Sequence, residues 1–376
     1  MLILSHNHES NLKILIVEPF FRGSHKAWAE GYARYSKHKV EIISLPGRFW
    51  KWRMHGGAVT LAKRYKKLNF EPNLILATDM LNLPVFQSLV KPKCPVAIYF
   101  HENQFTYPWS PADEDVKFQR DKHYGFINYS SALSADHIYF NSQFHLNSFF
   151  TGLEDFLRQF PDYREIQNIE RIKKKSSVLH IGMDLKKLDN YKVEKKTPKP
   201  PIILWNHRWE NDKNPEEFFN ILELLSSNGV EFQLIVLGEE FKKEMICFSK
   251  ARKNLKKHIL QFGFTQSFKD YAKWLWQADI LPVTSNQDFF GCSIMEAVYC
   301  QTIPLFPKRL TYPELYSINN NLHLFYEGSD GLIEKLTHVI QNIEGLRKQN
   351  YQAIAAKYDW SVMTKVYDRE FVRTQS

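Results

Sequence analysis

The stretch Ile280-Leu-Pro-Val283 is a short apolar run, and the segment Asp288-Phe-Phe-Gly-Cys-Ser-Ile-Met-Glu296 follows it after a polar loop. A short apolar run predicts a buried strand, and the segment after the loop predicts the start of a helix. Because Gly291 carries no Cβ, the backbone there can approach a ligand closely. The amides of Phe290, Gly291 and Cys292 would point out of a helix N-terminus, which suits a phosphate or a sugar hydroxyl. The order predicts one βα unit with a ligand at its loop, and an ordinary turn capped by its aspartate is the alternative.

The same alternation of apolar runs and amphipathic segments extends over most of the chain. In the first half it predicts strands at Lys13–Val17, Val40–Leu45, Leu74–Ala77, Val96–Phe100 and His137–Phe140, with helices such as Ala27–Tyr35 and Tyr124–Ser134. In the second half it predicts strands at Ile202–Trp205, Phe232–Leu237, His258–Phe262, Ile280–Val283 and Thr302–Phe306, with helices at Glu216–Ser226, Phe268–Ala278 and Ser293–Cys300. Strands that alternate with helices predict parallel sheets with helices on both faces.

The basic stretch Lys186–Pro201 separates the two halves, and its prolines and lack of apolar periodicity are typical of a linker. We therefore expect an α/β protein of two Rossmann-like domains that face each other across a cleft. The expected domains are residues 1–185 and residues 201–357. The final amphipathic stretch, residues 358–376, is expected to pack back on the first domain.

Composition agrees with a folded two-domain protein, since the 376 residues are 44% hydrophobic and 24% charged. A net charge of +9 favours an anionic partner, which can be nucleic acid, an acidic membrane or a phosphorylated ligand. The chain has no C-x-x-C pair, no secretory leader and no apolar run of membrane-spanning length, so we expect a cytoplasmic protein without a zinc site. The four cysteines are Cys94, Cys247, Cys292 and Cys300.

Two cations follow the first strand of the second half, in Trp205-Asn-His-Arg-Trp-Glu-Asn-Asp-Lys-Asn-Pro215. Ligands of α/β sheets bind at the carboxyl ends of strands, so Arg208 and Lys213 are placed to stabilise the charge on a diphosphate leaving group. Two solvated surface cations are the simpler alternative.

Polar residues also follow two strands of the first half. Glu18-Pro-Phe-Phe-Arg-Gly-Ser-His-Lys26 leads from the first strand into a helix, and His101-Glu-Asn-Gln104 ends the fourth. Such a polar run is costly unless it is solvated or bound to a ligand.

The stretch Phe49-Trp-Lys-Trp-Arg53 interleaves aromatic residues with cations. This pattern suits stacking on nucleic-acid bases, and a buried tryptophan pair is the alternative reading. Asp113-Glu-Asp115 formally matches the D-x-D metal motif, but its polar loop indicates a solvated run of charge.

The segments of the second half resemble the retaining GT-B glycosyltransferases that carry an E-x7-E motif. Arg208, Lys213, Asp288, Phe290-Gly291 and Glu296 match that pattern, with aspartate in place of the first glutamate. The resemblance implies that Glu296 binds the donor ribose, that Arg208 and Lys213 bind its diphosphate, and that no metal is needed. Retention would result from same-face attack, with the leaving phosphate accepting the proton.

The segments at 17–26, 45–53, 99–108, 205–215 and 288–300 occur in an order that is similar to the tRNA-queuosine α-mannosyltransferase family. That resemblance implies GDP-mannose as the donor and queuosine at the tRNA wobble position as the acceptor. The implied catalytic residues are His101, Arg208, Lys213 and Asp288. The implied donor-binding residues are Gly23, Ser24, Gly238, Gly263, Phe264, Phe289, Phe290, Gly291, Cys292 and Glu296. The implied acceptor-binding residues are His25, Trp50, Trp52, Arg53, Glu102, Asn103 and Gln104.

Three alternatives stay open at this point. A glycosyltransferase of envelope polysaccharide or glycolipid would use the same donor site, and its basic surface would meet anionic lipid. A non-catalytic RNA-binding protein on a GT-B fold would bind no sugar nucleotide. A sugar-nucleotide epimerase would share the two domains and would need no acceptor.

Overall fold

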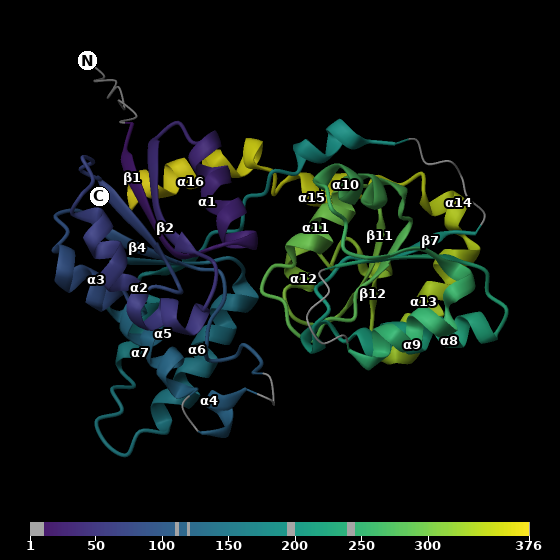
Figure 1. The fold of residues 1–376 in the computed structure, drawn as a ribbon, viewed down its shortest axis with the longest axis horizontal. Helices are drawn as coiled ribbons and strands as arrows, with labels where there is room; N and C mark the ends of the chain where they lie inside the picture. The colour runs from purple at the N-terminus through teal and green to yellow at the C-terminus, as the bar shows by residue number, and fades with distance from the viewer. Residues whose placement is uncertain (1–10, 110–112, 119–120, 194–199, 239–244, 376) are drawn as a thin grey trace. The chain divides into compact units, whose positions relative to one another are not determined.

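The computed structural model describes residues 11–109, 113–118, 121–193, 200–238 and 245–375 (Figure 1). The chain divides into two compact units. The first unit runs up to Met183 and takes in the C-terminal segment from Trp360, and the second runs from Asp184 to Asp359.

The first unit is built on a six-stranded parallel sheet in the order β2-β1-β3-β4-β5-β6. Ile14 to Val17 of β1 are all buried, because helices cover both faces of a parallel sheet. The strands are β1 (Lys13–Phe21), β2 (Lys39–Pro46), β3 (Leu74–Thr78), β4 (Val96–Phe100), β5 (His137–Phe140) and β6 (Ser176–Val178). The helices are α1 (Gly23–Tyr35), α2 (Trp50–Tyr65), α3 (Leu83–Val90), α4 (Glu114–Lys117), α5 (Lys122–Ser134), α6 (Gln143–Arg158), α7 (Asn168–Lys173) and α16 (Trp360–Arg373).

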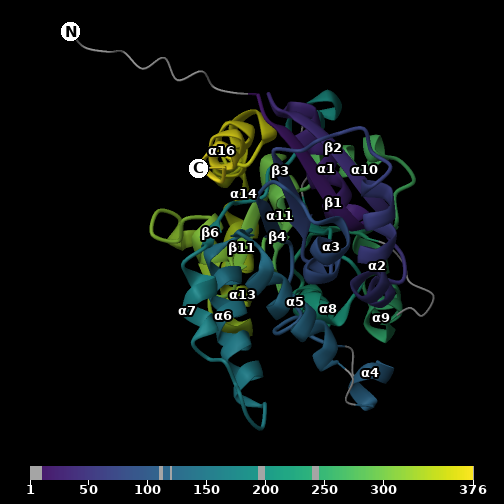
Figure 2. The same cartoon turned by 90° about the vertical axis from the view of Figure 1, so that its left-hand side faces the viewer.

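Helix α16 packs on α1 within the first unit, as Figure 1 and Figure 2 show in yellow and purple. Trp28 donates from Nε1 to the hydroxyl of Tyr367 at 3.0 Å, and Tyr32 donates to Asp368 Oδ1 at 2.9 Å. All four side chains are buried, so the C-terminal helix completes the core on that side of the sheet.

The second unit holds a second six-stranded parallel sheet, in the order β12-β11-β10-β7-β8-β9. The strands are β7 (Ile202–Trp205), β8 (Gln233–Leu237), β9 (Ile259–Gly263), β10 (Ile280–Pro282), β11 (Ile303–Pro307) and β12 (Phe325–Tyr326). The α-helices are α8 (Pro215–Ser227), α9 (Ile246–Asn254), α10 (Phe268–Gln277), α11 (Cys292–Tyr299), α12 (Tyr312–Leu315), α13 (Gly328–Gln341), α14 (Ile343–Leu346) and α15 (Gln352–Ala356). Short 3₁₀ helices lie at Lys186–Tyr191, Asn211–Lys213, Lys256–His258 and Leu322–Leu324.

The start of the predicted linker differs from the expectation. Lys186–Tyr191 is a 3₁₀ helix that belongs to the second unit. Leu188 is buried there and its carbonyl accepts from Trp276 Nε1 at 2.9 Å, while Asp189 accepts from the Tyr299 hydroxyl at 2.9 Å. A 3₁₀ helix of six residues is too short to show periodicity. Residues 194–199 of the predicted linker lie outside the described residues.

The strands β6 and β12 have no counterpart among the predicted strands, because each is a short edge strand without a long apolar run. Across the described ranges, no helix combines the length and the apolar character that a bilayer crossing requires.

Candidate functional site

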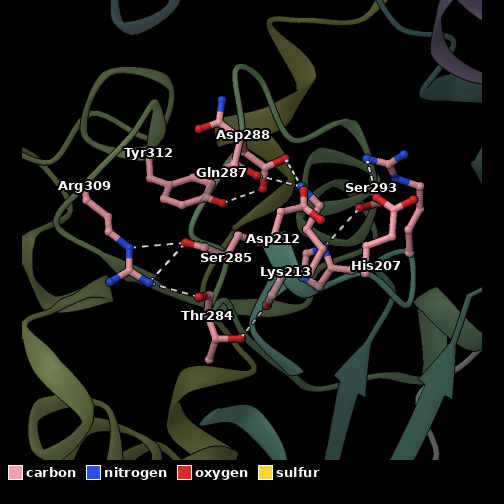
Figure 3. A network of polar contacts seen from close by, with 12 residues as sticks. His207, Asp212, Lys213, Thr284, Ser285, Gln287, Asp288, Ser293, Arg309 and Tyr312 are labelled. Carbon is pink, nitrogen blue, oxygen red and sulfur yellow. Dashed lines mark hydrogen bonds and ion pairs between the residues drawn. The ribbon is translucent and has the colours of Figure 1, made fainter. Parts of the chain in front are cut away.

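Strand order places the polar loops of the second unit together. Strands β7 and β10 are neighbours, and the chain continues from β7 toward one edge of the sheet and from β10 toward the other. Ligands of open α/β sheets bind at the carboxyl ends of the strands where the connections diverge in this way. The loops after β7 and β10 carry Lys213 and Asp288, and Figure 3 shows the two side chains pointing toward one another.

The Lys213 ammonium is enclosed by oxygen atoms. Its Nζ lies 2.7 Å from the carbonyl oxygen of Gln287, 2.9 Å from Asp288 Oδ1 and 3.0 Å from Asp212 Oδ2. Burial by itself would lower the pKa of Lys213, but Asp288 and Asp212 outweigh it and raise the pKa to about 12. The contacts with Gln287 and Asp288 are hydrogen bonds, whereas the contact with Asp212 is an ion pair without hydrogen-bond geometry.

Asp288 has a partner on each carboxylate oxygen, since Tyr312 donates to Oδ2 at 2.6 Å while Lys213 holds Oδ1 (Figure 3). Burial would raise the pKa of Asp288, and the Lys213 charge reverses that and lowers it. The implied catalytic role of Asp288 stays a prediction. In the structure the Asp288 carboxylate accepts from Lys213 and from Tyr312. The sequence did not indicate Tyr312.

Arg309 binds the backbone of the loop that carries Asp288 (Figure 3). Its Nη2 donates to the carbonyl oxygens of Thr284 and Ser285 at 2.9 and 3.1 Å. The Thr284 hydroxyl in turn donates to the carbonyl oxygen of Lys213 at 3.0 Å. The loops after β7 and β10 are therefore tied together through side chains as well as through the central ion pair.

Two further residues of the loop after β7 are buried beside this network. Asn206 donates from Nδ2 to the Ser293 carbonyl oxygen at 2.7 Å, which fixes the loop to the first turn of α11. Burial lowers the pKa of His207 to about 4, so its ring is neutral at physiological pH. Its Nδ1 lies 3.5 Å from the Ser293 hydroxyl oxygen.

Arg208 differs from Lys213 in its exposure. Its side chain is 51% exposed, and its Nη2 lies 3.0 Å from Glu210 Oε2. Burial raises the pKa of Glu210, although Arg208 opposes this effect. A half-exposed guanidinium with several N–H donors is suited to an anionic ligand.

Glu296, on α11, accepts at Oε2 from the hydroxyl of Tyr271 on α10 at 2.7 Å. Burial raises the pKa of this carboxyl, and the tyrosine hydrogen bond opposes the rise. Nothing in the sequence predicts the partnership, since Tyr271 is one of several aromatic residues on an amphipathic helix.

Glycines shape the loops that were predicted to contact the donor. Gly291 is the N-cap of α11 at a φ of 80°, and Gly263 ends β9 at a φ of 118°, a conformation that favours glycine. A Cβ on Gly238 would lie 2.4 Å from the carbonyl oxygen of His207, so only glycine fits at the end of β8. Phe264 is exposed and Cys292 half-buried, whereas Phe289 and Phe290 are buried, and their predicted contact with the donor stays a prediction.

In the first unit, β1 lies between β2 and β3, so its connections also diverge at the carboxyl ends. The ring nitrogen Nδ1 of His25 lies 3.0 Å from Glu18 Oε2, and the His25 and His101 rings are 4.2 Å apart. The ring of Trp28 meets His101 edge to face at 4.8 Å. Asp79, after β3, accepts from the His101 amide at 2.9 Å. All of these side chains are buried.

The two histidines have opposite electrostatic environments. Burial alone would lower the pKa of His25, but the Glu18 carboxylate raises it to about 9. Burial and the neighbouring His25 lower the pKa of His101. Within the described part of the chain, neither ring nitrogen of His101 has a hydrogen-bond partner, which leaves it able to bind a ligand.

The other predicted residues of this region lie around the same strand ends. Asn103 Oδ1 accepts from the amides of Phe105 and Thr106 at 3.1 Å, so its carbonyl side shapes the turn. Gln104 donates from Nε2 to Glu102 Oε1 at 3.1 Å. Gly23, at a φ of 55°, and Ser24 open α1 and are exposed.

The aromatic stretch at the start of α2 divides into a packed and an exposed part. Trp50 packs against Trp109 at 5.7 Å between ring centroids, and Arg53 donates to the Pro46 carbonyl oxygen at 3.2 Å. Trp52 is 65% exposed. The alternative of a buried tryptophan pair is therefore wrong for Trp52, and stacking on nucleic-acid bases stays a prediction.

The interpretation of residues 113–115 as a solvated run of charge holds for the exposed Glu114 but is wrong for the two aspartates. Lys51 Nζ lies 2.5 Å from Asp113 Oδ1 and 2.6 Å from Asp115 Oδ2, and the two carboxylates are only 22% and 15% exposed. The lysine of α2 comes from 62 residues away in sequence, so local composition could not predict the pairing.

Among the residues that the structure describes, one trio of possible metal ligands has its ligand atoms within 4.8 Å of one another, namely Glu18, His25 and His101. Glu18 gives its two oxygens to the Phe20 amide and to His25 directly. This is the geometry of a hydrogen-bonded pair, so we do not assign a metal to the trio.

Comparison with known proteins agrees with this architecture. A family model described as tRNA-queuosine alpha-mannosyltransferase N-terminal matches residues 13–183, and one described as glycosyl transferases group 1 matches residues 187–356. The chain is 33% identical over 350 residues to the tRNA-queuosine alpha-mannosyltransferase of Drosophila melanogaster, with 90% of each chain covered.

Solved structures share the fold at low identity. Sucrose-phosphate synthase from Thermosynechococcus elongatus has a TM-score of 0.68 at 14% identity, over 96% of this chain and 100% of that chain. A glycosyltransferase from Rickettsia africae has a TM-score of 0.67 at 17% identity, over 97% of this chain and 99% of that chain. These matches confirm the predicted α/β fold with two Rossmann-like units of the GT-B type. The polar strand ends, the two family models and the extended identity together show that this chain is a glycosyltransferase of the tRNA-queuosine alpha-mannosyltransferase family.

Proposed function

We propose that the protein transfers mannose from GDP-mannose to queuosine in tRNA, with retention of the α configuration. The observation that carries this proposal is the 33% identity to the Drosophila protein over 90% of both chains, which spans both units. The polar set at the strand ends supports it, because Arg208, Lys213 and Glu296 are all present and held in place.

For the donor nucleotide, Glu296 is the proposed ribose ligand. Tyr271 holds one carboxylate oxygen at 2.7 Å, and the other oxygen is the one we assign to the ribose hydroxyls. The glycine loop at Gly263 and the exposed ring of Phe264 are the proposed contacts of the base.

For the diphosphate, Arg208 and Lys213 are the proposed cations. Arg208 is half-exposed and can turn from Glu210 to a phosphate oxygen. Lys213 already has three oxygen neighbours, so a phosphate oxygen would have to replace one of them. We propose that it replaces the Asp212 carboxylate. Negative charge that develops on the leaving diphosphate would then meet fixed positive charge.

For the transferred sugar, His101 is the proposed contact, because its ring nitrogens are buried and have no partner among the described residues. Attack on the same face as the departing phosphate, with that phosphate taking the acceptor proton, would retain the α configuration. We propose that no metal takes part, since the Arg208 and Lys213 pair would supply the positive charge.

For the acceptor, we propose that tRNA meets the basic protein through stacking and phosphate contacts. The exposed rings of Phe49 and Trp52 lie at the start of α2, and the Arg48 guanidinium lies 5.8 Å from the Phe49 ring centroid. Aromatic rings beside cations suit a base that is splayed out of a loop.

The test is transfer of radiolabel from GDP-mannose to tRNA, with queuosine-containing and queuosine-free tRNA side by side. Label on the modified tRNA alone is expected. Label on both tRNAs, or on neither while sugar-nucleotide binding persists, would reject queuosine as the acceptor. The second outcome would point to a glycan or glycolipid acceptor. An absence of sugar-nucleotide binding in calorimetry would reject the donor.

A matched pair of variants tests the diphosphate assignment. Arg208→Ala is expected to lower turnover by about one to three orders of magnitude, the scale for lost transition-state charge stabilisation. Lys250→Ala removes another exposed cation of the same unit and is expected to leave turnover unchanged. Equal turnover in the two variants would reject the role of Arg208.

A further inference from the structure

Glu18 is a carboxylate buried near the carboxyl end of strand β1, with a fractional exposure of 0%. An unpaired carboxylate is costly to bury, so its neighbours indicate why it is there. Its Oε1 accepts from the Phe20 amide at 2.7 Å and its Oε2 from His25 Nδ1 at 3.0 Å. One oxygen anchors the carboxylate to its own strand, and the other is aimed at a histidine on the next element.

His25 lies in the first turn of α1, with a fractional exposure of 6%. Its ring contacts Glu18, and the ring centroids of His101 and Phe20 lie 4.2 and 6.1 Å from its own. Because Nδ1 is engaged by Glu18, the nitrogen left for a ligand is Nε2. A carboxylate that binds one nitrogen of a histidine sets the ring orientation and the proton on the other nitrogen.

We infer that Glu18 is a positioning residue that holds His25 as an imidazolium, whose Nε2–H donates to an oxygen atom of a bound substrate. The inference rests on the proposed function for the identity of the substrates. It assigns a role to Glu18, which the family resemblance leaves without one. An imidazolium is a donor to a hydroxyl or to a phosphate oxygen, and these two sources are separated by the experiment below.

The charges around His25 come from several elements and favour its protonated form. Glu18 on β1 is in direct contact, and Asp79 after β3 and Glu102 after β4 act at longer range. Burial raises the pKa of Asp79 itself to about 8, so its charge contributes little to His25 at neutral pH. His101 also faces the ring, but burial and the charge of His25 keep it neutral. The balance raises the pKa of His25 to about 9, so the imidazolium is the form present at neutral pH.

The sign of the pH dependence follows from this balance. A function that needs protonated His25 is complete below its pKa and is lost as the pH rises through about 9. Glu18→Gln keeps the size of the side chain and removes the charge. Burial then lowers the pKa of His25, so the alkaline limit of activity should move down by about two pH units.

The first arm of the experiment does not depend on activity. Histidine labelled with ¹³C is titrated by NMR in the wild-type protein and in Glu18→Gln, and His25→Asn assigns the resonance. We expect His25 to titrate near pH 9 in the wild type and below pH 7 in Glu18→Gln. The resonance of His145, whose pKa burial lowers to about 3, is the internal reference that should stay unchanged. A wild-type His25 that titrates below pH 7, or the same value in both proteins, would overturn the pairing.

The second arm measures transfer from GDP-mannose to queuosine-containing tRNA between pH 6 and pH 10. The alkaline limb should move to lower pH in Glu18→Gln and disappear in His25→Asn. Glu170→Gln, an exposed carboxylate on α7 of the same unit, is the matched control and should keep the wild-type profile. If KM in His25→Asn rises for GDP-mannose alone, the oxygen atom that accepts from His25 belongs to the donor. If KM rises for tRNA alone, that oxygen atom belongs to the acceptor. An alkaline limb that does not move would overturn the substrate role.

The two arms separate the inference from the proposed function. If no tRNA accepts label, the proposed function fails while the NMR arm still decides the pairing. If Glu18→Gln does not fold, the wild-type titration and the profile of His25→Asn decide the inference.

Discussion

Replacing Lys213 by methionine removes a buried ammonium and keeps most of its apolar stem. In the wild type, Nζ lies within 3.0 Å of Asp212 and Asp288 and 2.7 Å from the Gln287 carbonyl oxygen. The variant leaves two carboxylates close together in a largely buried place, with no charge between them. We expect the second unit to lose stability and the enzyme to lose turnover.

The magnitude follows from the pKa of Lys213, which its surroundings raise from 10.5 to about 12. A difference of about 1.5 units at about 1.36 kcal/mol per unit is about 2 kcal/mol, and this value already includes the opposing effect of burial. Removing one partner of a buried pair typically costs about 3–5 kcal/mol, because the other charge is left without compensation. We therefore expect the free energy of unfolding to fall by about 2–5 kcal/mol.

The assay is urea unfolding at pH 7, followed by hydrogen exchange and mass spectrometry so that each unit is observed separately. The double variant Lys213→Met with Asp288→Asn should lose less than the sum of the two single losses, because it removes charges of both signs. Lys250→Met, an exposed lysine paired with Glu223, is the control and should change stability by less than about 0.5 kcal/mol.

The pH dependence of the free energy of unfolding tests the Lys213–Asp288 contact a second time. Lys213 lowers the pKa of Asp288, so this pairing stabilises the wild type above the unfolded pKa of an aspartate and is lost as the pH falls through the folded pKa. In the variant, Asp288 protonates at higher pH, which relieves its repulsion from Asp212. The difference in free energy of unfolding between the wild type and Lys213→Met should therefore decrease toward pH 4. A loss below about 1 kcal/mol at pH 7, or a difference that increases in acid, would refute the reasoning.

Three further predictions follow from single contacts. Tyr271→Phe removes the hydroxyl that donates to Glu296, so KM for the sugar nucleotide should rise by about tenfold, the scale of a lost hydrogen bond to a charged group. A nucleotide that lacks the ribose hydroxyls should bind the wild type and the variant equally. Gly31→Ala would bring a Cβ to 2.0 Å from Trp360 Nε1, so thermal unfolding of the first unit should show a loss of about 1–3 kcal/mol, and an unchanged melting temperature would contradict the packing of α16 on α1. Trp52→Ala should weaken tRNA binding by about 1–3 kcal/mol in a filter-binding assay and leave the melting temperature unchanged, and unchanged affinity would exclude stacking at this ring.

The strands were well predicted because a buried parallel strand is an unbroken apolar run. Ile202–Trp205 has the predicted bounds, and each end of the other predicted strands of the second unit lies within one residue of its place in the structure. The edge strands β6 and β12 escaped prediction because two or three paired residues leave no pattern.

The composition of the candidate site was also predictable to a degree. Polar residues at strand ends drew attention to Arg208, Lys213, His101 and the loop before Glu296, since a parallel sheet gathers its carboxyl ends at one edge. The partners of these residues were not predictable. Tyr271 lies 25 residues from Glu296 in sequence and carries no signal of its own.

The sequence by itself determined the two Rossmann-like units, the loops that carry polar side chains and the family resemblance. These three features depend on local patterns, which can be recognised in the order of the residues alone. The tertiary structure alone decided that Tyr312 and Lys213 share the carboxylate of Asp288 from 24 and 75 residues away, and that Glu18 faces His25. The order of strands in the sheet brings these groups together, and that order depends on the packing of the whole unit rather than on spacing along the chain.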